Sequence, residues 1–248
     1  MTTPPLMLNG HARAGSAFRA RFGASPHQMI RAPGRVNLLG EPAGEPDGVR
    51  LYLAVEQSLW LALRPRSDGR VILHDADRAE ALEFDAGAPE KSAPSWRELV
   101  KGVAAALRVA GWPLSGWEGC VASDIPEQAD FAASAALALA VARAFSERAR
   151  RPWDGWEAAR LCKQARLGWG GGDFSLYDGW VVALAEERSA LWVDPRAQQV
   201  KAIPLPNYFA WMLLVNGRPA VIPPAAGNGP ESLGRAAAKR MGALAAIS

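Results

Sequence analysis

The chain has 248 residues, 49% hydrophobic and 21% charged, an ordinary composition for a soluble globular protein with one large domain or two small ones. Its formal net charge is only +3, and its arginines are dispersed rather than clustered with aromatic residues, which argues against nucleic-acid binding. No apolar run approaches the roughly 20 residues that span a bilayer, and the polar first residues lack a signal-peptide core. We therefore expect a cytoplasmic protein without membrane contact.

Cysteine and histidine usage indicates neither a disulfide framework nor a zinc site. Cys120 and Cys162 have no metal-ligand spacing, and we expect both to be buried thiols. The three histidines are scattered along the sequence, so they form no candidate zinc site or catalytic triad.

The first half of the chain is expected to alternate helices and strands. Apolar residues at helical spacing that stop at a glycine predict a helix over 9–23, and an amphipathic pattern closed by glycine and proline predicts another over 96–110. Apolar, β-branched and aromatic runs predict strands over 49–64, 70–74 and 117–125.

The second half begins with an Ala/Leu-rich helix over 131–150 and a helix over 154–166 capped by Asp154, which a glycine run breaks. Beyond these we expect a hairpin over 179–194, a strand over 208–215, and a tail with an amphipathic helix over 231–246. This plan predicts an α+β (α/β two-layer) domain over 1–216, followed by a Gly/Pro-rich tail over 217–248.

The string with the clearest chemistry is APGRVNLLGE, residues 32–41. Taken alone, the string predicts a strand and a turn, and Arg35 has two interpretations. Its cation points into a cleft, or it forms a structural pair with Glu41 beside the turn. The string resembles the galactokinase signature, the first motif of the GHMP small-molecule kinases.

The resemblance extends over about residues 9–217 in collinear order. The similar stretches are 18–26, 48–66, 96–111, 125–126 and 134–137. It implies the N-terminal domain of a GHMP kinase, a fold of the ribosomal protein S5 domain 2 type. It covers about half of a typical galactokinase, and we expect the family's C-terminal domain to be absent.

The family transfers a phosphoryl group from ATP to the anomeric hydroxyl of galactose, with Mg²⁺. The resemblance implies that Arg35 and Asp173 are the catalytic residues, and that Glu41 contacts the sugar. Asp47 is a possible substitute on the sugar side, because the family's histidine and aspartate are here Pro42 and Gly44. Asp173 also has a plainer explanation, as a helix cap after a glycine loop.

The phosphate loop departs most from the family pattern. By resemblance, Ala132, Ala133 and Ser134 are the nucleotide-binding residues, and Ser134 is the remnant of the magnesium site. The family's two glycines are missing, and Glu127 and Asp130 border the place of the triphosphate, where carboxylates repel phosphate. We favour a structural role for Asp130 as N-cap of the 131–150 helix.

The magnesium site also differs, because Arg166 stands where the resemblance places a magnesium-binding glutamate. Three functions stay open: an active sugar kinase with ATP and Mg²⁺ as cofactors; an inactive relative that senses a sugar or nucleotide or binds a protein; or a decayed fragment, which the intact hydrophobic pattern argues against. We expect a galactokinase-like protein with weak or no activity. We also expect the tail, a homodimer or a partner chain to cover the face left by the missing domain.

Overall fold

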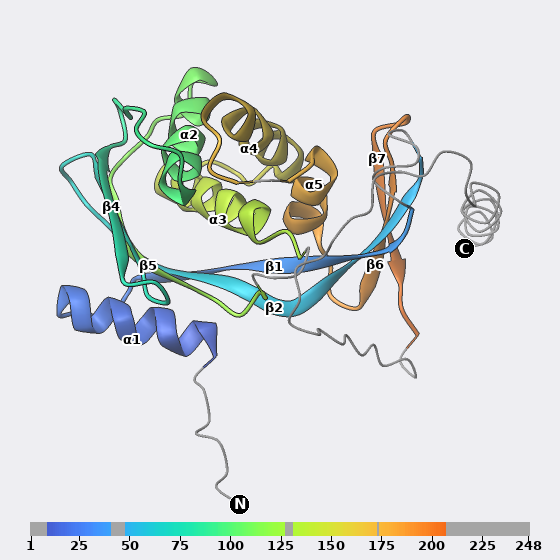
Figure 1. Ribbon diagram of the computed structural model, residues 1–248, viewed down its shortest axis with the longest axis horizontal. Helices are drawn as coiled ribbons and strands as arrows, with labels where there is room; N and C mark the ends of the chain where they lie inside the picture. The colour runs from blue at the N-terminus through green and yellow to red at the C-terminus, as the bar shows by residue number, and fades with distance from the viewer. Residues whose placement is uncertain (1–8, 41–47, 127–130, 173, 207–248) are drawn as a thin grey trace, which may run out of the picture.

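The computed structural model describes residues 9–40, 48–126, 131–172 and 174–206. These residues form one mixed β-sheet with helices on both faces (Figure 1). Helices α2 (Trp96–Val109), α3 (Ala133–Arg148), α4 (Gly155–Trp169) and α5 (Leu176–Leu184) lie on one face, and α1 (Gly10–Phe22) lies alone on the other. The predicted α+β class is confirmed.

The sheet is organised around one long strand. The strands are β1 (Gln28–Leu39), β2 (Arg50–Pro65), β3 (Arg70–Asp75), β4 (Glu80–Asp85), β5 (Trp117–Ser123), β6 (Ser189–Asp194) and β7 (Gln199–Pro204). Their order is β4-β3-β5-β2-β6-β7, and β1 pairs with β2 outside that path. Strand β2 is antiparallel to β1, β5 and β6, whereas β3 and β5 are parallel. The strands predicted over 49–64, 70–74 and 117–125 are confirmed.

Helix α1 begins and ends as its sequence predicts. The Asn9 side chain accepts a hydrogen bond from the backbone N–H of Ala12, and Gly23 ends the helix with a φ of 66°. The buried residues Ala14 and Phe18 pack against β2 and β5 with Cys120, which is one of two free, buried cysteines. Burial raises the pKa of the Cys120 thiol to about 11, so this cysteine is not a reactive thiolate at neutral pH.

Helix α3 lies at the centre of the main core, between the sheet and helices α2 and α4. Its alanines allow this close packing, because they carry no side chain beyond Cβ. Five of them are completely buried: Ala135, Ala136, Ala138, Ala142 and Ala144. The helices predicted over 96–110, 131–150 and 154–166 are confirmed, including the Asp154 cap, which accepts from the backbone N–H groups of Trp156 and Glu157.

Two sequence predictions are wrong. The hairpin over 179–194 does not form, because Ser175 and Asp178 make a capping box that starts α5, and only 189–194 is a strand. A short apolar run does not distinguish a helix from a strand. Asp130 does not hold the N-cap position of α3, because Ala132 occupies it. Asp130 itself, the strand over 208–215 and the helix over 231–246 lie outside the described residues.

Within the described ranges, no helix is both long and apolar enough to cross a bilayer.

A buried ion pair fastens α2 to the loop before it. Glu98 and Lys101, both on α2, lie 2.5 Å apart, and their side chains are 2% and 7% exposed. The Lys101 ammonium also donates to the Glu90 carbonyl and to Ser92 Oγ, while the Glu98 carboxylate accepts from the backbone N–H and hydroxyl of Ser92. Burial alone would raise the pKa of Glu98, but the bonds from Lys101 and Ser92 outweigh it and hold that pKa below its ordinary value.

We predict that Glu98→Ala lowers the free energy of unfolding by about 3–5 kcal/mol, because it leaves the Lys101 charge buried without this partner. Glu157→Ala, which removes an exposed pair with Arg151, should cost about 1 kcal/mol or less. Since the pKa of Glu98 is lowered on folding, the wild-type stabilisation is complete above its ordinary value of 4.5 and is lost as the pH falls through the lower folded-state value. Chemical denaturation of both variants at pH 7 and pH 3.5 checks this, and equal losses for the two variants would contradict it.

Candidate functional site

The signature residues 32–39 lie in β1, where the strand is irregular. Pro33 pairs with Ser58 of β2 and Arg35 pairs with Ala54, so the register shifts at Gly34. A Cβ atom on Gly34 would lie 3.2 Å from the Gln57 carbonyl oxygen, which leaves little room for a side chain. The Arg35 backbone N–H donates to the Phe131 carbonyl at 3.0 Å, so this irregularity ties β1 to the segment that precedes α3.

The Arg35 guanidinium lies in a buried ion pair. Its Nε donates to Oδ1 of Asp178 on α5 at 2.7 Å, and both side chains are only 7% exposed. The Tyr52 ring lies beside the guanidinium, with 5.6 Å from Cζ to the ring centroid. Burial raises the pKa of the Tyr52 hydroxyl, and the negative charge of Asp178 raises it further. Sequence reasoning missed Asp178; the Ser175-x-x-Asp178 capping pattern is the signal that could have found it.

The glycine run after α4 packs between two helix starts. Gly170 and Gly171 have φ values of 78° and 80°, which glycine adopts without strain. A Cβ on Gly171 would lie 2.3 Å from the Ser95 carbonyl oxygen before α2, and one on Gly172 would lie 2.8 Å from Ser134 Oγ in α3. The run therefore passes directly against the start of α3.

Two cations of α4 hold this loop on both sides of position 173. Arg166 Nε donates to the Gly172 carbonyl at 3.4 Å, and Lys163 Nζ donates to the Phe174 carbonyl at 3.0 Å. The Phe174 side chain is buried in the main core. Arg166 thus contacts the loop that leads to position 173.

The proposed nucleotide-binding residues lie together at the N-terminus of α3. Ala132 is the N-cap, with left-handed φ and ψ of 58° and 38°, and its side chain makes no capping hydrogen bond. Ala133 is the first helical residue, and Ser134 is in contact with Gly172. The structure thus groups Ala132, Ala133 and Ser134 near the loop before Asp173 and links them to Arg35 through Phe131.

Three predicted site residues, Glu41, Asp47 and Asp173, lie outside the described residues. The residues on either side of 41–47 are close together, because a Cβ on Gly40 would lie 2.7 Å from the Val49 carbonyl oxygen. Residues 40 and 49, which flank the predicted sugar segment, therefore lie beside each other, next to the pair of Leu39 with Leu51.

Among the described residues, no carboxylate is recorded beside Ser134 that could share a magnesium ion with it. Mg²⁺ prefers carboxylate and water oxygens in an octahedral arrangement. In the described part of the chain, no group of three or more histidine, cysteine, aspartate or glutamate side chains is placed to hold a metal. The groups that meet at Gly172 are the Ser134 hydroxyl and the Arg166 guanidinium.

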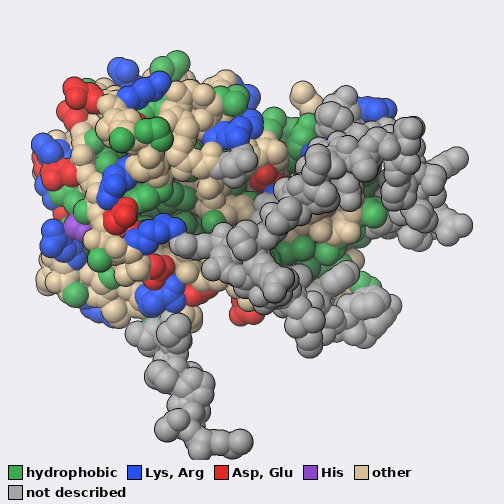
Figure 2. All heavy atoms as spheres, viewed as in Figure 1, with side chains coloured by type: hydrophobic (Ala, Val, Ile, Leu, Met, Phe, Trp, Pro, Cys, Tyr) green, Lys and Arg blue, Asp and Glu red, His purple; other side chains and the backbone are tan. Residues whose placement is uncertain are grey.

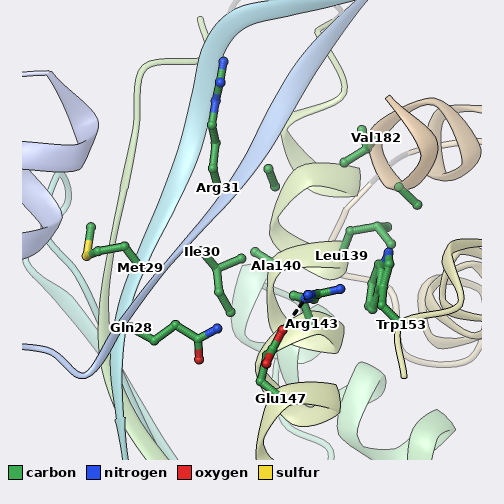
Figure 3. A pocket seen from close by; sticks show the side chains of 12 residues that line it. Gln28, Met29, Ile30, Arg31, Leu139, Ala140, Arg143, Glu147, Trp153 and Val182 are labelled. Carbon is green, nitrogen blue, oxygen red and sulfur yellow. Dashed lines mark ion pairs between the residues drawn. The ribbon is translucent and has the colours of Figure 1, made fainter. Parts of the chain in front are cut away.

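Two cavities lie along β1, and neither is lined by a predicted site residue. One, of about 330 Å³, separates residues 28–32 of β1 from α3 and Trp153 (Figure 3). Within it Arg143 pairs with Glu147 and lies over the Trp153 ring. The other, of about 920 Å³, is lined by residues 53–57 and 185–189, among others. On the face seen in Figure 2, acidic and basic side chains are interspersed.

Comparisons with known proteins agree with the signature. The galactokinase galactose-binding signature matches residues 16–65. The galactokinase of Roseiflexus sp. is 36% identical over 189 residues, which are 76% of this chain and 48% of that protein. The galactokinase of Streptomyces coelicolor is 35% identical over 77% of this chain and 50% of its own length, and the human one 32% identical over 83% and 54%. The chain thus spans about half the length of the curated relatives it matches.

Solved structures show the same fold. Lactococcus lactis galactokinase, crystallised with galactose, superposes with a TM-score of 0.69 at 23% identity, over 77% of this chain and 50% of that one. Methanococcus jannaschii mevalonate kinase superposes with a TM-score of 0.58 at 17% identity, over 71% of this chain and 56% of that one. The arrangement of sheet and helices is therefore that of the GHMP kinases.

We predict that Gly171→Ala lowers the free energy of unfolding by about 1–3 kcal/mol, because alanine is strained at a φ of 80° and its Cβ would meet the Ser95 carbonyl. Gly168→Ala is the matched control, since its Cβ would meet nothing within 4 Å inside α4, and it should stabilise by about 0.5–1 kcal/mol. Thermal denaturation of the two variants tests this prediction. Equal melting temperatures would show that the loop does not depend on glycine at 171.

Proposed function

We propose that this chain, which belongs to the galactokinase family and matches the N-terminal half of its members, binds a sugar beside Arg35 and phosphorylates it weakly or not at all. The observation that carries the proposal is the contact of Gly172 with both Ser134 and Arg166. In the proposal, Arg166 stands in the sequence where the resemblance implies a magnesium-binding glutamate, and Arg35 is the arginine of the sugar side.

The sugar side supports binding. Phosphoryl transfer depends on holding the sugar hydroxyl and the charges around it in place rather than on covalent chemistry. Arg35 is held by Asp178 and Tyr52, and the loop around position 173 is held by Lys163, Arg166 and the buried Phe174. In the proposal, Arg35 favours the sugar oxyanion and Asp173 orients or deprotonates the hydroxyl.

The sequence on the phosphate side of the site is the argument for weak or absent catalysis. A helix N-terminus binds phosphate through free backbone N–H groups and a glycine-rich approach. Here the sequence before α3 has lost both glycines and gained Glu127 and Asp130. Carboxylates close to a triphosphate repel it, because both groups carry negative charge.

A second candidate function is a sugar sensor that does not phosphorylate. It is favoured by the buried Arg35–Asp178 pair, which keeps the sugar side fixed although the phosphate side has changed. A site can bind a polar ligand through its fixed hydrogen-bonding groups even when no transition state is stabilised. Calorimetry separates the two candidates.

We expect Mg·ATP to bind with a Kd weaker than about 1 mM, roughly −4 kcal/mol, because the phosphate side lacks its glycines and its magnesium carboxylate. Galactose should bind more tightly than Mg·ATP. Separate calorimetric titrations of the purified chain test this. Mg·ATP binding well below millimolar would overturn the weak-kinase proposal, and heat from galactose alone would favour the sensor. The absence of binding heat with both ligands would contradict the sugar-binding proposal.

We also expect Arg166→Glu to strengthen Mg·ATP binding by about tenfold or more, because it replaces a cation with a hard oxygen ligand at the loop where Gly172 lies against Ser134. Lys163→Glu is the matched control, since it makes the same charge change on the same helix but faces the Phe174 carbonyl. The gain should require Mg²⁺ and disappear with ATP in EDTA. An equal gain in both variants would mean that net charge, not a magnesium ligand, is limiting.

A further inference from the structure

We propose that Arg50 is a positioning residue of the sugar side: it fixes the Tyr52 ring that lies against Arg35. The inference rests on the proposed function in one respect, namely that a sugar binds beside Arg35. Arg50 is not among the site residues that the sequence predicted. It is the first residue of β2, and it reaches the site because the end of β1, the start of β2 and the start of α5 meet there.

The Arg50 side chain is almost fully buried where β2 begins. The residue is 4% exposed, and it pairs with Val193 of β6. A Cβ atom on Gly40, the residue that follows β1, would lie 3.0 Å from Arg50 Cγ, so the stem of the arginine packs against that backbone. Burying a guanidinium costs free energy unless protein groups replace the water that it loses. The groups around Arg50 therefore hold it in one place.

Two tyrosines from different elements meet the Arg50 guanidinium. Its Cζ lies 4.7 Å from the centroid of the Tyr177 ring, in the first turn of α5, which is within cation–π range. Arg50 also donates a hydrogen bond to the Tyr52 hydroxyl. Side chains two residues apart in a strand point to the same face. This is the helix-covered face, because Tyr52 packs with Ala159 of α4 and Trp180 of α5.

Tyr52 carries the effect of Arg50 to Arg35. Tyr52 is 2% exposed, and its ring centroid lies 5.6 Å from Arg35 Cζ. Burial and the charge of Asp178 raise the pKa of the Tyr52 hydroxyl, whereas Arg50 and Arg35 both lower it, so this hydroxyl is within electrostatic reach of both arginines. The ring cannot leave its place beside Arg35 without breaking the hydrogen bond from Arg50, which is costly in a buried place. Arg50 thus holds the hydroxyl end of the ring that Arg35 faces.

Stacking on aromatic rings does not by itself distinguish Arg50 from other arginines. Arg64 lies on the same strand, with its Cζ 5.8 Å from the ring centroids of both Phe18 and Phe22. Its side chain is 31% exposed and pairs with Glu118. These two phenylalanines belong to α1, on the opposite face of the sheet from α4 and α5 (Figure 1). Arg64→Met is therefore a matched control for Arg50→Met.

The test is a double-mutant cycle on galactose binding, measured by calorimetry with Arg50→Met, Tyr52→Phe and the double variant. Methionine removes the charge but keeps a long flexible side chain, and phenylalanine removes the hydroxyl but keeps the ring. Each single change should weaken galactose binding by about tenfold, as expected for a lost hydrogen bond to a charged group. The double variant should be within about twofold of the weaker single variant, because both changes remove the same bond. Arg64→Met should stay within about twofold of the wild type.

Unchanged galactose affinity in Arg50→Met would overturn the inference, and so would losses that multiply in the double variant. If Arg50→Met does not fold, Arg50→Lys replaces it in the cycle. Lysine keeps the charge but not the planar fork, so it should weaken binding by about threefold and show the same coupling to Tyr52→Phe. Additive losses with Arg50→Lys would count against the inference in the same way.

A carbon-13 NMR signal supplies a readout that needs no sugar. The chain has three tyrosines, so the Cζ resonance of Tyr52 can be assigned by its loss in Tyr52→Phe. This resonance should move in Arg50→Met and stay in place in Arg64→Met, because only the first change removes the hydrogen bond to the hydroxyl. If the wild-type chain binds no galactose, the proposed function fails, and this resonance alone decides whether Arg50 fixes Tyr52. An unmoved resonance would overturn the inference.

Discussion

The buried ion pair between Arg35 and Asp178 is the contact on which the arrangement of the site depends. It joins the signature strand β1 to helix α5, two elements that no short stretch of sequence connects. Because both charges are nearly inaccessible to solvent, each needs the other, and the elements that carry them are held in one relative position. The irregularity at Gly34 adds a second link, from the Arg35 backbone to the segment before α3.

The phosphate end of the site is held by different means. Helix α3 packs through small alanines in the main core, and the glycine run passes against its first turn, where Gly172 contacts Ser134. Arg166 and Lys163 of α4 then fix the carbonyls on both sides of position 173. In both proposed functions, the weak kinase and the sugar sensor, the backbone around the site is fixed while the charges on the phosphate side differ from the family pattern. A fixed backbone does not by itself supply a magnesium ligand.

The sequence predicted most of the fold, whereas the roles that it assigns to the site residues stay predictions. Helices with clear caps, such as α1 with Asn9 and α4 with Asp154, and strands with long apolar runs, such as β2, were predictable from local patterns. Helix α5 was not, since a short apolar run fits a strand equally well, and the side chains of Ser175 and Asp178 decide between them. The start of α3 was also misplaced, because the backbone at Ala132 turns left-handed without a capping side chain.

The sequence by itself determined the family, through a signature whose order of residues is hard to obtain by chance, and it named Arg35 and Ser134 as site residues. Only the tertiary structure decided which groups surround them: Asp178 and Tyr52 beside Arg35, and Gly172 between Ser134 and Arg166. The physical reason is that buried charges and close backbone contacts depend on partners far apart along the chain, which local spacing does not record.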